Sequence, residues 1–239
     1  MENIIANIDR IQQRIYNACV TSGRNPETVK LLLATKTVHA DNIKLALNHG
    51  QTLIAENKIQ ELKEKFDALQ DTPHQSHFIG HLQTNKVKEL LRYNVSCLQS
   101  LDRLKLAEKL QRRLAYEDKT MDVFLQFNTS YEDSKFGMAP ENALAFAKEI
   151  LQFDRIQIKG LMTIGLFSAN DEKVRKCFQV LKRIQTNLLD HGFPVHELSM
   201  GMSGDLEIAI EEGATIIRVG TAIFGKRPYP DSYYWNENS

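Results

Sequence analysis

A lysine at the end of an apolar run is the first side chain whose position suggests chemistry. Lys36 follows residues 31–35, LLLAT, a continuous run typical of a strand buried on both faces in a parallel sheet. Such strands carry functional residues at their carboxyl ends. A half-buried lysine loses solvation of its charged form, which lowers its pKa and makes its amine a nucleophile. A lysine that merely reaches water from the sheet end would give the same pattern, so the run alone leaves both interpretations open.

Two later segments contain small and hydroxyl-bearing residues that could bind an anion. Residues 199–205 read SMGMSGD, and residues 218–222 read RVGTA. Their backbone N–H groups can approach an anion closely, and Ser199, Ser203 and Thr221 add hydroxyl donors. Each segment alone is also typical of an ordinary tight turn. Whether the two segments form one anion site therefore depends on whether the fold brings them together.

The elements that must position these residues alternate regularly along the chain. An opening helix carries one apolar stripe, formed by Ile4, Ile8, Ile11, Ile15 and Ala18. Apolar segments then recur between amphipathic helices and turns that contain glycine or proline. We expect eight strands, at residues 31–36, 52–55, 77–80, 95–98, 122–127, 158–164, 197–200 and 214–219.

Eight strand–helix units in about 200 residues predict an α/β fold, a closed (β/α)8 barrel of the TIM type. An open doubly wound sheet is the competing architecture. It usually has a glycine-rich turn after its first strand, and residues 37–41 contain no glycine. Strands one and eight of a closed barrel are neighbours. Lys36 and residues 218–221 should therefore face the same mouth, where anion sites commonly form after strands seven and eight.

An amine beside an anion site matches the two ends of pyridoxal 5′-phosphate. This cofactor needs an amine for a Schiff base and a site for its dianionic phosphate. A barrel that binds a phosphorylated sugar would use the same anion site. The pairing therefore suggests the cofactor and leaves the phosphosugar alternative open.

The composition is that of an ordinary globular protein and argues against several classes. Thirty basic and thirty acidic residues balance, so no overall charge recruits nucleic acid or anionic lipid. No apolar run approaches the roughly 18 residues of a membrane span, and the amino terminus lacks a signal peptide pattern. The three cysteines form no CxxC pair, which is typical of reduced thiols in a cytoplasmic protein. We expect one domain over residues 1–239, with a helix within 1–25 and a tail at 226–239.

Six blocks of sequence, in order along the chain, form a recognisable set of motifs. They read LATK at residues 33–36, ENKIQE at 56–61, HFIGHLQTNK at 77–86, SKFG at 134–137, GLMTI at 160–164 and LSMGMSGD at 198–205. With them the chain closely resembles the pyridoxal phosphate homeostasis protein family, single-domain relatives of alanine racemase, from about residue 31 to residue 225. The resemblance implies a barrel like the amino-terminal domain of alanine racemase.

The resemblance also implies which residues hold the cofactor, pyridoxal 5′-phosphate. Lys36 would form the Schiff base, and Arg218, by its position, would be the partner of the pyridine nitrogen. Four residues of the last two loops would hold the phosphate: Ser199, Ser203, Gly220 and Thr221. Two further residues would line the pocket: Asn57 and Met200.

Three positions depart from the family pattern. Ala55 replaces a usual glycine, Lys58 a usual tyrosine or arginine, and Tyr131 a common glycine. None is a position implied to contact the cofactor. These departures therefore bear on the shape of neighbouring loops rather than on cofactor binding.

Four other polar features have simple structural interpretations. Glu56 and Asp205 are expected to cap helices, and the charged run 58–65 is expected to be a solvated helix face. His81 follows a strand and precedes a helix. It either fixes that loop or touches a ligand, and the sequence leaves both interpretations open.

The resemblance implies a protein that holds pyridoxal phosphate and serves in intracellular vitamin B6 homeostasis as a carrier or buffer. A pyridoxal-phosphate-dependent amino-acid racemase of the alanine racemase type is the alternative. A two-base racemase needs a second acid–base group opposite the lysine. Alanine racemases take it from a carboxyl-terminal β domain, and this chain ends at Ser239, soon after the barrel. An arginine at the pyridine nitrogen would also weaken the ring as an electron sink.

We therefore expect a carrier without robust catalytic activity, and neither a catalytic residue nor a metal ligand. The expected partners are pyridoxal phosphate and, as recipients, pyridoxal-phosphate-dependent apo-enzymes. Neither nucleic acid nor a membrane is expected as a partner. A monomer and a weak dimer are both compatible with the sequence.

Overall fold

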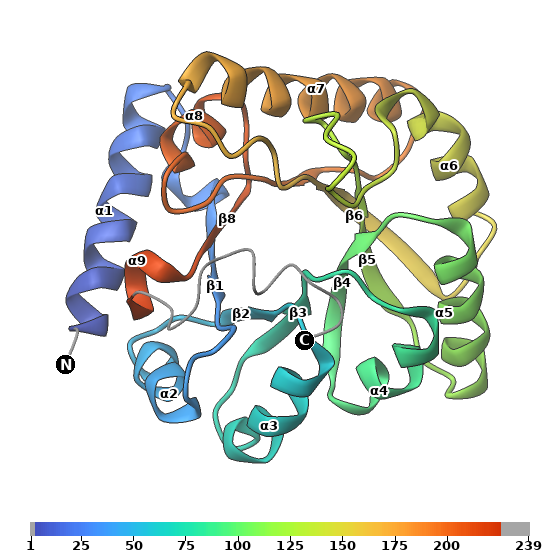
Figure 1. The fold of residues 1–239 in the computed structure, drawn as a ribbon, viewed down its shortest axis with the longest axis horizontal. Helices are drawn as coiled ribbons and strands as arrows, with labels where there is room; N and C mark the ends of the chain where they lie inside the picture. Colours follow the sequence, from blue (N-terminus) through green and yellow to red (C-terminus); the bar gives the residue numbers. More distant parts are fainter. Residues whose placement is uncertain (1–2, 226–239) are drawn as a thin grey trace.

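Eight parallel strands close into one barrel in the computed structural model, which describes residues 3–225 (Figure 1). The strands follow one another in chain order, and β1 pairs with β8 to close the barrel. They are β1 (Lys30–Ala34), β2 (Leu53–Glu56), β3 (Gln75–Phe78), β4 (Val95–Leu101), β5 (Met121–Gln126), β6 (Ile156–Met162), β7 (Glu197–Ser199) and β8 (Ile216–Val219). The predicted (β/α)8 barrel is confirmed. The predicted tail, 226–239, lies outside the described residues.

Helices surround the barrel (Figure 1). The α-helices are α1 (Ile4–Thr21), α2 (Ala40–Asn48), α3 (Ile59–Leu69), α4 (Val87–Arg92), α5 (Leu104–Tyr116), α6 (Ala143–Ile150), α7 (Asp171–Asp190), α8 (Leu206–Glu211) and α9 (Thr221–Phe224). Short 3-10 turns are η1 (Pro26–Thr28), η2 (Thr84–Lys86) and η3 (Pro140–Asn142). Among the described residues, no helix is both long and apolar enough to span a bilayer.

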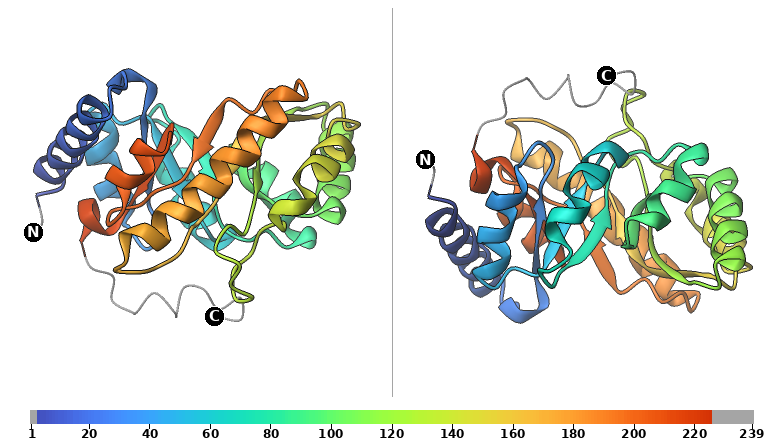
Figure 2. Two further views of the ribbon diagram at one scale, coloured as in Figure 1. Left: turned by 90° about the horizontal axis from the view of Figure 1, so that it is seen from above. Right: turned by 90° about the horizontal axis from the view of Figure 1, so that it is seen from below.

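The opening helix is the addition to the eightfold repeat. Its predicted apolar stripe is buried along its whole length, from Ile4 to Ala18. This face packs against α8 and α9, and Figure 2 shows α1 at one end of the molecule beside α9. The helix thus supports the last two strand–helix connections, which carry the predicted anion site.

The apolar runs of the strands are explained by burial on both faces. Leu32 belongs to the cluster inside the barrel, whereas Leu33 belongs to the layer between strands and helices, and both are fully buried. Consecutive residues of a strand point to opposite faces, so a strand covered on both sides is apolar throughout. The cysteines are free and buried within these layers.

The strand ends decide which side chains reach the mouth of the barrel. β1 ends at Ala34, two residues before Lys36, and Thr37 adopts a positive φ of 64° that turns the chain toward α2. β7 ends at Ser199, one residue earlier than predicted, and α8 begins at Leu206. Residues 200–205 therefore form a loop at the mouth.

Candidate functional site

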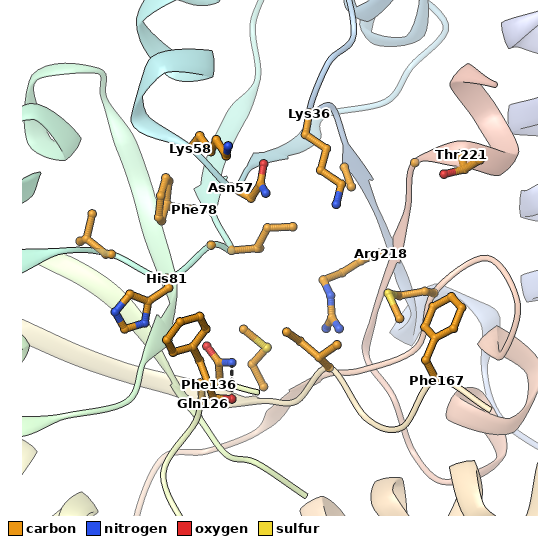
Figure 3. Close-up of a pocket in the computed structure, with 18 of the residues that line it drawn as sticks. Lys36, Asn57, Lys58, Phe78, His81, Gln126, Phe136, Phe167, Arg218 and Thr221 are labelled. Atoms are coloured by element: carbon orange, nitrogen blue, oxygen red, sulfur yellow. Dashed lines mark hydrogen bonds between the residues drawn. The ribbon is translucent and has the colours of Figure 1, made fainter. Parts of the chain in front are cut away.

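A cavity of about 510 Å³ opens at the mouth of the barrel. Loops after β1, β2, β3, β5, β6, β7 and β8 contribute to its wall. Figure 3 shows Lys36 and Arg218 pointing into this space, with Thr221 on one side and His81 and Phe136 on the other. Six of the eight predicted site residues line the cavity: Lys36, Asn57, Ser203, Arg218, Gly220 and Thr221.

The other two predicted residues lie elsewhere. Met200 is fully buried in the apolar layer outside the strands. Ser199 is also fully buried, and its hydroxyl lies between Arg218 and Gln99 rather than in the cavity wall. Ser199 therefore contacts Arg218 and does not line the cavity, and its predicted contact with a phosphate stays a prediction.

The turn that carries Lys36 is held by a buried cluster of charged side chains. Lys65 Nζ donates to Thr35 O at 2.8 Å and to Glu56 Oε1 at 2.7 Å. The Thr35 hydroxyl donates to the same Glu56 oxygen at 2.6 Å. On the other side of Lys36, Thr37 N–H donates to Glu61 Oε2 at 3.1 Å. Backbone groups on both sides of Lys36 are thus fixed by side chains of β2 and α3.

This cluster corrects two expectations. Lys65 is only 7% exposed, so the run 58–65 is not simply a solvated helix face. Glu56 is 2% exposed and caps no helix. A signal was present in the sequence, because Lys65 follows Leu62 by three residues and precedes Leu69 by four. It therefore occupies a position on the buried stripe of α3.

Burial dominates the titration of Glu56. It raises the pKa of this carboxyl from 4.5 to about 7, while the charge and hydrogen bond of Lys65 and the Thr35 hydroxyl act in the opposite direction. A carboxyl in an apolar environment favours its neutral form unless partners offset the lost solvation. Glu56 is therefore sensitive to the loss of Lys65.

Arg218 reaches the cavity from the barrel interior. It is 5% exposed, and its two terminal nitrogens donate to Ser199 Oγ and to Thr163 O, each at 2.8 Å. Burial lowers the pKa of the guanidinium to about 10, so Arg218 remains charged at neutral pH. The cavity thus contains a fixed cation.

The loop between β7 and α8 is held from two directions. Asp205 Oδ1 accepts a hydrogen bond from Met202 N–H at 2.6 Å, which closes the loop on itself. Asp205 stands at the start of α8, as predicted, but its side chain bonds backward to this loop and makes no capping bond. From α1, Arg14 donates to Ser203 O at 3.1 Å and forms a two-pronged pair with Glu207.

Arg14 is a functional residue that sequence reasoning missed. The pairing joins residues 189 positions apart, and nothing local to α1 indicates it. It gives the extra helix a role, since the carbonyl of Ser203 is fixed by a side chain from that helix. The same contact fixes the loop that carries the Ser203 hydroxyl at the cavity.

The glycines of this region fit a site where an anion must approach the backbone. A Cβ at Gly220 would lie 2.8 Å from Ala34 O, so this position must stay small for β8 to pass close to the end of β1. Gly204 is exposed, and a Cβ there would meet nothing within 4 Å. Their backbone N–H groups and the hydroxyls of Ser203 and Thr221 are hydrogen-bond donors that an anion in the cavity with Lys36 could accept from.

Gly80 sets the position of Asn57. A Cβ on Gly80 would lie 1.9 Å from the carbonyl oxygen of Asn57, a distance that no relaxation of side chains could relieve. The two loops after β2 and β3 therefore touch through their backbones. Only glycine permits this contact, which places Asn57 in the cavity wall.

Replacing Gly80 with alanine is expected to destabilise the protein by about 1–3 kcal/mol, because the backbone of Asn57 must move away. Chemical denaturation measures this loss directly. Gly204→Ala is the matched control, since it adds the same methyl group in open space. Equal stability of the two variants would show that the close contact at Gly80 is not required.

His81 belongs to the cavity wall on the side away from Thr221 (Figure 3). Its ring stacks on Phe136 with the ring centres 3.9 Å apart, and its Nδ1 lies 3.5 Å from Asp102 Oδ2. Arg103 pairs with Asp102 and donates to Leu82 O, which ties this loop to the start of α5. His81 thus joins the loops after β3 and β5 and also faces the cavity, so both interpretations of this residue retain support.

The chain matches known proteins over almost its whole length. Residues 1–228 match the family described as alanine racemase, N-terminal domain. The pyridoxal phosphate homeostasis protein of Aquifex aeolicus is 40% identical over 228 residues, which cover 95% of this chain and 100% of the relative. That of Pseudomonas aeruginosa is 39% identical over 229 residues, covering 96% and 98%.

Solved structures agree with this relationship. PipY of Synechococcus elongatus, solved with pyridoxal phosphate bound, has a TM-score of 0.82 at 29% identity and covers 93% of this chain and 100% of its own. An alanine racemase of Clostridium difficile has a TM-score of 0.70 at 14% identity, with 92% of this chain and 57% of its own covered. The second likeness concerns the fold alone.

Proposed function

This chain belongs to the pyridoxal phosphate homeostasis proteins of the alanine racemase N-terminal domain family, and we propose that it binds pyridoxal 5′-phosphate through Lys36 and holds it for delivery. One observation carries the proposal: Lys36, the Arg218 guanidinium and the hydroxyls of Ser203 and Thr221 line the same cavity. When bound, the cofactor supplies an aldehyde that bonds covalently to an amine and a phosphate that needs hydrogen-bond donors.

The residues divide this task among themselves. Lys36 supplies the amine, and the buried cluster around Thr35 and Thr37 keeps its backbone in place. Ser203 and Thr221, with the backbone at Gly204 and Gly220, hold the phosphate. Arg218 faces the pyridine ring, and Asn57 lines the pocket.

Reduction with borohydride tests the proposal, because it converts a C=N bond into a stable amine. Purified protein is loaded with pyridoxal phosphate, reduced, digested and analysed by mass spectrometry. We expect the added mass on the peptide that contains Lys36. No added mass, or added mass only on other lysines, would contradict the proposed function.

We propose storage and delivery rather than amino-acid chemistry. Arg218 stays charged at neutral pH, and a cation at the pyridine nitrogen disfavours its protonation. The ring is then a weak electron sink, which slows removal of a substrate α-proton. Loaded protein in deuterated water should exchange the α-protons of alanine no faster than free pyridoxal phosphate does. Faster exchange would favour a racemase.

The anion site should control how readily the cofactor leaves. In the double variant Ser203→Ala/Thr221→Val, two hydroxyl donors are lost, and each charge-assisted hydrogen bond contributes about 1.5–3 kcal/mol. We expect affinity to fall roughly tenfold or more per hydroxyl, and transfer to an apo-enzyme to become faster.

The control for this double variant is Ser22→Ala/Thr28→Val, which removes two hydroxyls that bond to carbonyls outside the cavity. Both proteins are compared with the wild type by equilibrium dialysis and by the rate of reactivation of an apo-enzyme. Equal affinities and equal transfer rates in the two double variants would contradict the assignment of Ser203 and Thr221 to the anion site.

A further inference from the structure

A chain of buried polar side chains crosses the interior of the barrel, next to its apolar cluster. The interior cluster consists of Leu32, Leu53, Ala55, Cys97, Phe124, Met162 and Ile216. Gln99 lies two residues after Cys97, and Arg218 two residues after Ile216, so strand alternation turns both to the same interior. His77 on β3 and Ser199 on β7 complete the chain, and all four residues are at most 8% exposed.

Three consecutive hydrogen bonds connect these residues. Arg218 Nη1 lies 2.8 Å from Ser199 Oγ, Ser199 Oγ lies 2.6 Å from Gln99 Oε1, and Gln99 Nε2 lies 2.7 Å from His77 Nδ1. The chain thus runs from β8 through β7 and β4 to β3. It ends at His77, which does not line the cavity.

The donor order of the chain follows from its two ends. A guanidinium only donates, so Ser199 accepts from Arg218 and turns its own proton toward the Gln99 oxygen. The Gln99 amide then donates to His77 Nδ1, which assigns the ring proton of His77 to Nε2. Burial lowers the pKa of His77 to about 4, so the ring is a neutral acceptor at neutral pH. Each member has a partner of the correct kind.

Such a chain does little for the stability of the barrel itself. Apolar residues pack in the same interior, and a satisfied buried polar network is roughly neutral against apolar residues of similar size. The chain has a clearer effect on the position of Arg218. Ser199 holds one terminal nitrogen of Arg218 and Thr163 O holds the other, so both the position and the plane of the guanidinium are fixed.

We propose that Gln99 and His77 are positioning residues that act through Ser199 to fix the plane of the Arg218 guanidinium at the cavity. The proposal rests on the proposed function in one respect only, namely that Arg218 faces the cofactor. Neither Gln99 nor His77 lines the cavity, so neither touches the ligand.

The first test needs no cofactor. Nitrogen-15 NMR of the full-length protein measures how fast the Arg218 guanidinium rotates about its Nε–Cζ bond, with the signal assigned by its absence in Arg218→Met. We expect rotation at least tenfold faster in Gln99→Met than in the wild type. Gln185→Met is the matched control, because Gln185 is also a buried glutamine but bonds to Val195 O and His196 O. Equal rates in the Gln99 and Gln185 variants would overturn the proposal.

A pair of variants at the far end of the chain separates positioning from simple packing. His77→Asn keeps a hydrogen-bond acceptor for the Gln99 amide, whereas His77→Phe keeps the bulk and removes the acceptor. We expect wild-type rotation of Arg218 in His77→Asn and faster rotation in His77→Phe. Faster rotation in both, or in neither, would show that the acceptor at position 77 does not matter.

The loaded protein supplies the second readout. We expect Gln99→Met and His77→Phe to shift the absorption maximum of the bound cofactor in the direction that Arg218→Lys shifts it, with no shift in Gln185→Met or His77→Asn. If Arg218 rotation responds as expected but neither the wild type nor any variant binds the cofactor, the positioning proposal holds and the proposed function fails. If the cofactor binds but rotation and spectrum are unchanged in Gln99→Met, the function holds and positioning fails.

Discussion

Replacing Lys36 with alanine is expected to abolish the borohydride-stable attachment of pyridoxal phosphate and to weaken its binding by at least about a hundredfold. The variant loses the only covalent contact that we assign to the cofactor. The hydroxyls of Ser203 and Thr221 remain, so weak binding of the phosphate should persist. Absorption spectra with and without borohydride measure the attachment, and equilibrium dialysis measures the affinity.

Lys86→Ala is the control for this experiment, because Lys86 also lines the cavity and its removal leaves Lys36 intact. We expect this variant to keep the attachment. If instead Lys36→Ala were reduced and labelled like the wild type, the amine would have to be another lysine. If Lys36 is the correct assignment, the triple variant that lacks Lys36 and both hydroxyls should show no measurable binding.

The fold could be predicted because each of its determinants is local. An apolar strand, a turn and an amphipathic helix recur eight times, and a parallel barrel is the arrangement that covers both faces of every strand. The juxtaposition of Lys36 with Gly220 and Thr221 followed from closure. It required only that β1 and β8 pair, as they do from Lys30 to Leu33.

The side chains near strand ends could not all be placed from the sequence. Ser199 and Ser203 are both serines in one glycine-rich block, but β7 still includes Ser199 and turns its hydroxyl toward Gln99. Ser203 lies four residues later, in the loop, and reaches the cavity. Consecutive residues of a strand point to opposite faces, and no local pattern shows which face Ser199 takes.

Contacts between elements that are distant in the sequence also could not be predicted from it. Arg14 and Ser203, like His77 and Gln99, meet only because the chain has folded. Their residue types are common on surfaces, so they give no signal before folding. Lys65 is intermediate, since its helical spacing indicated burial whereas its charge indicated exposure.

The buried cluster beside Lys36 predicts a large and pH-dependent effect on stability. In Lys65→Met, Glu56 keeps its burial but loses the cation that favours its charged form. Breaking a buried ion pair by removing one partner costs about 3–5 kcal/mol when the other group remains charged, and less when that group takes up a proton instead. The pKa of Glu56, already raised to about 7, should rise further in the variant.

The direction of the pH dependence follows from this raised pKa. Between pH 4.5 and about 7 the folded protein holds a proton on Glu56 that the unfolded chain has released. Stability contributed by this group is therefore complete at low pH and is lost as the pH rises through the folded pKa. Lys65 offsets part of the loss in the wild type and cannot do so in the variant.

We therefore expect urea denaturation to give a deficit for Lys65→Met that is larger at pH 8 than at pH 5.5 by about 1.4 kcal/mol, because Glu56 loses its proton above about pH 7 in the wild type but keeps it to higher pH in the variant. At pH 5.5 Glu56 is protonated in both folded proteins, so the deficit comes from the lost contacts of Lys65 with Thr35 O and Glu61 Oε2, at about 0.5–1.5 kcal/mol each. Lys63→Met on the exposed face of α3 is the control and should change little at either pH. A deficit for Lys65→Met that did not grow between pH 5.5 and pH 8 would contradict the assignment of Glu56 as its buried, titrating partner.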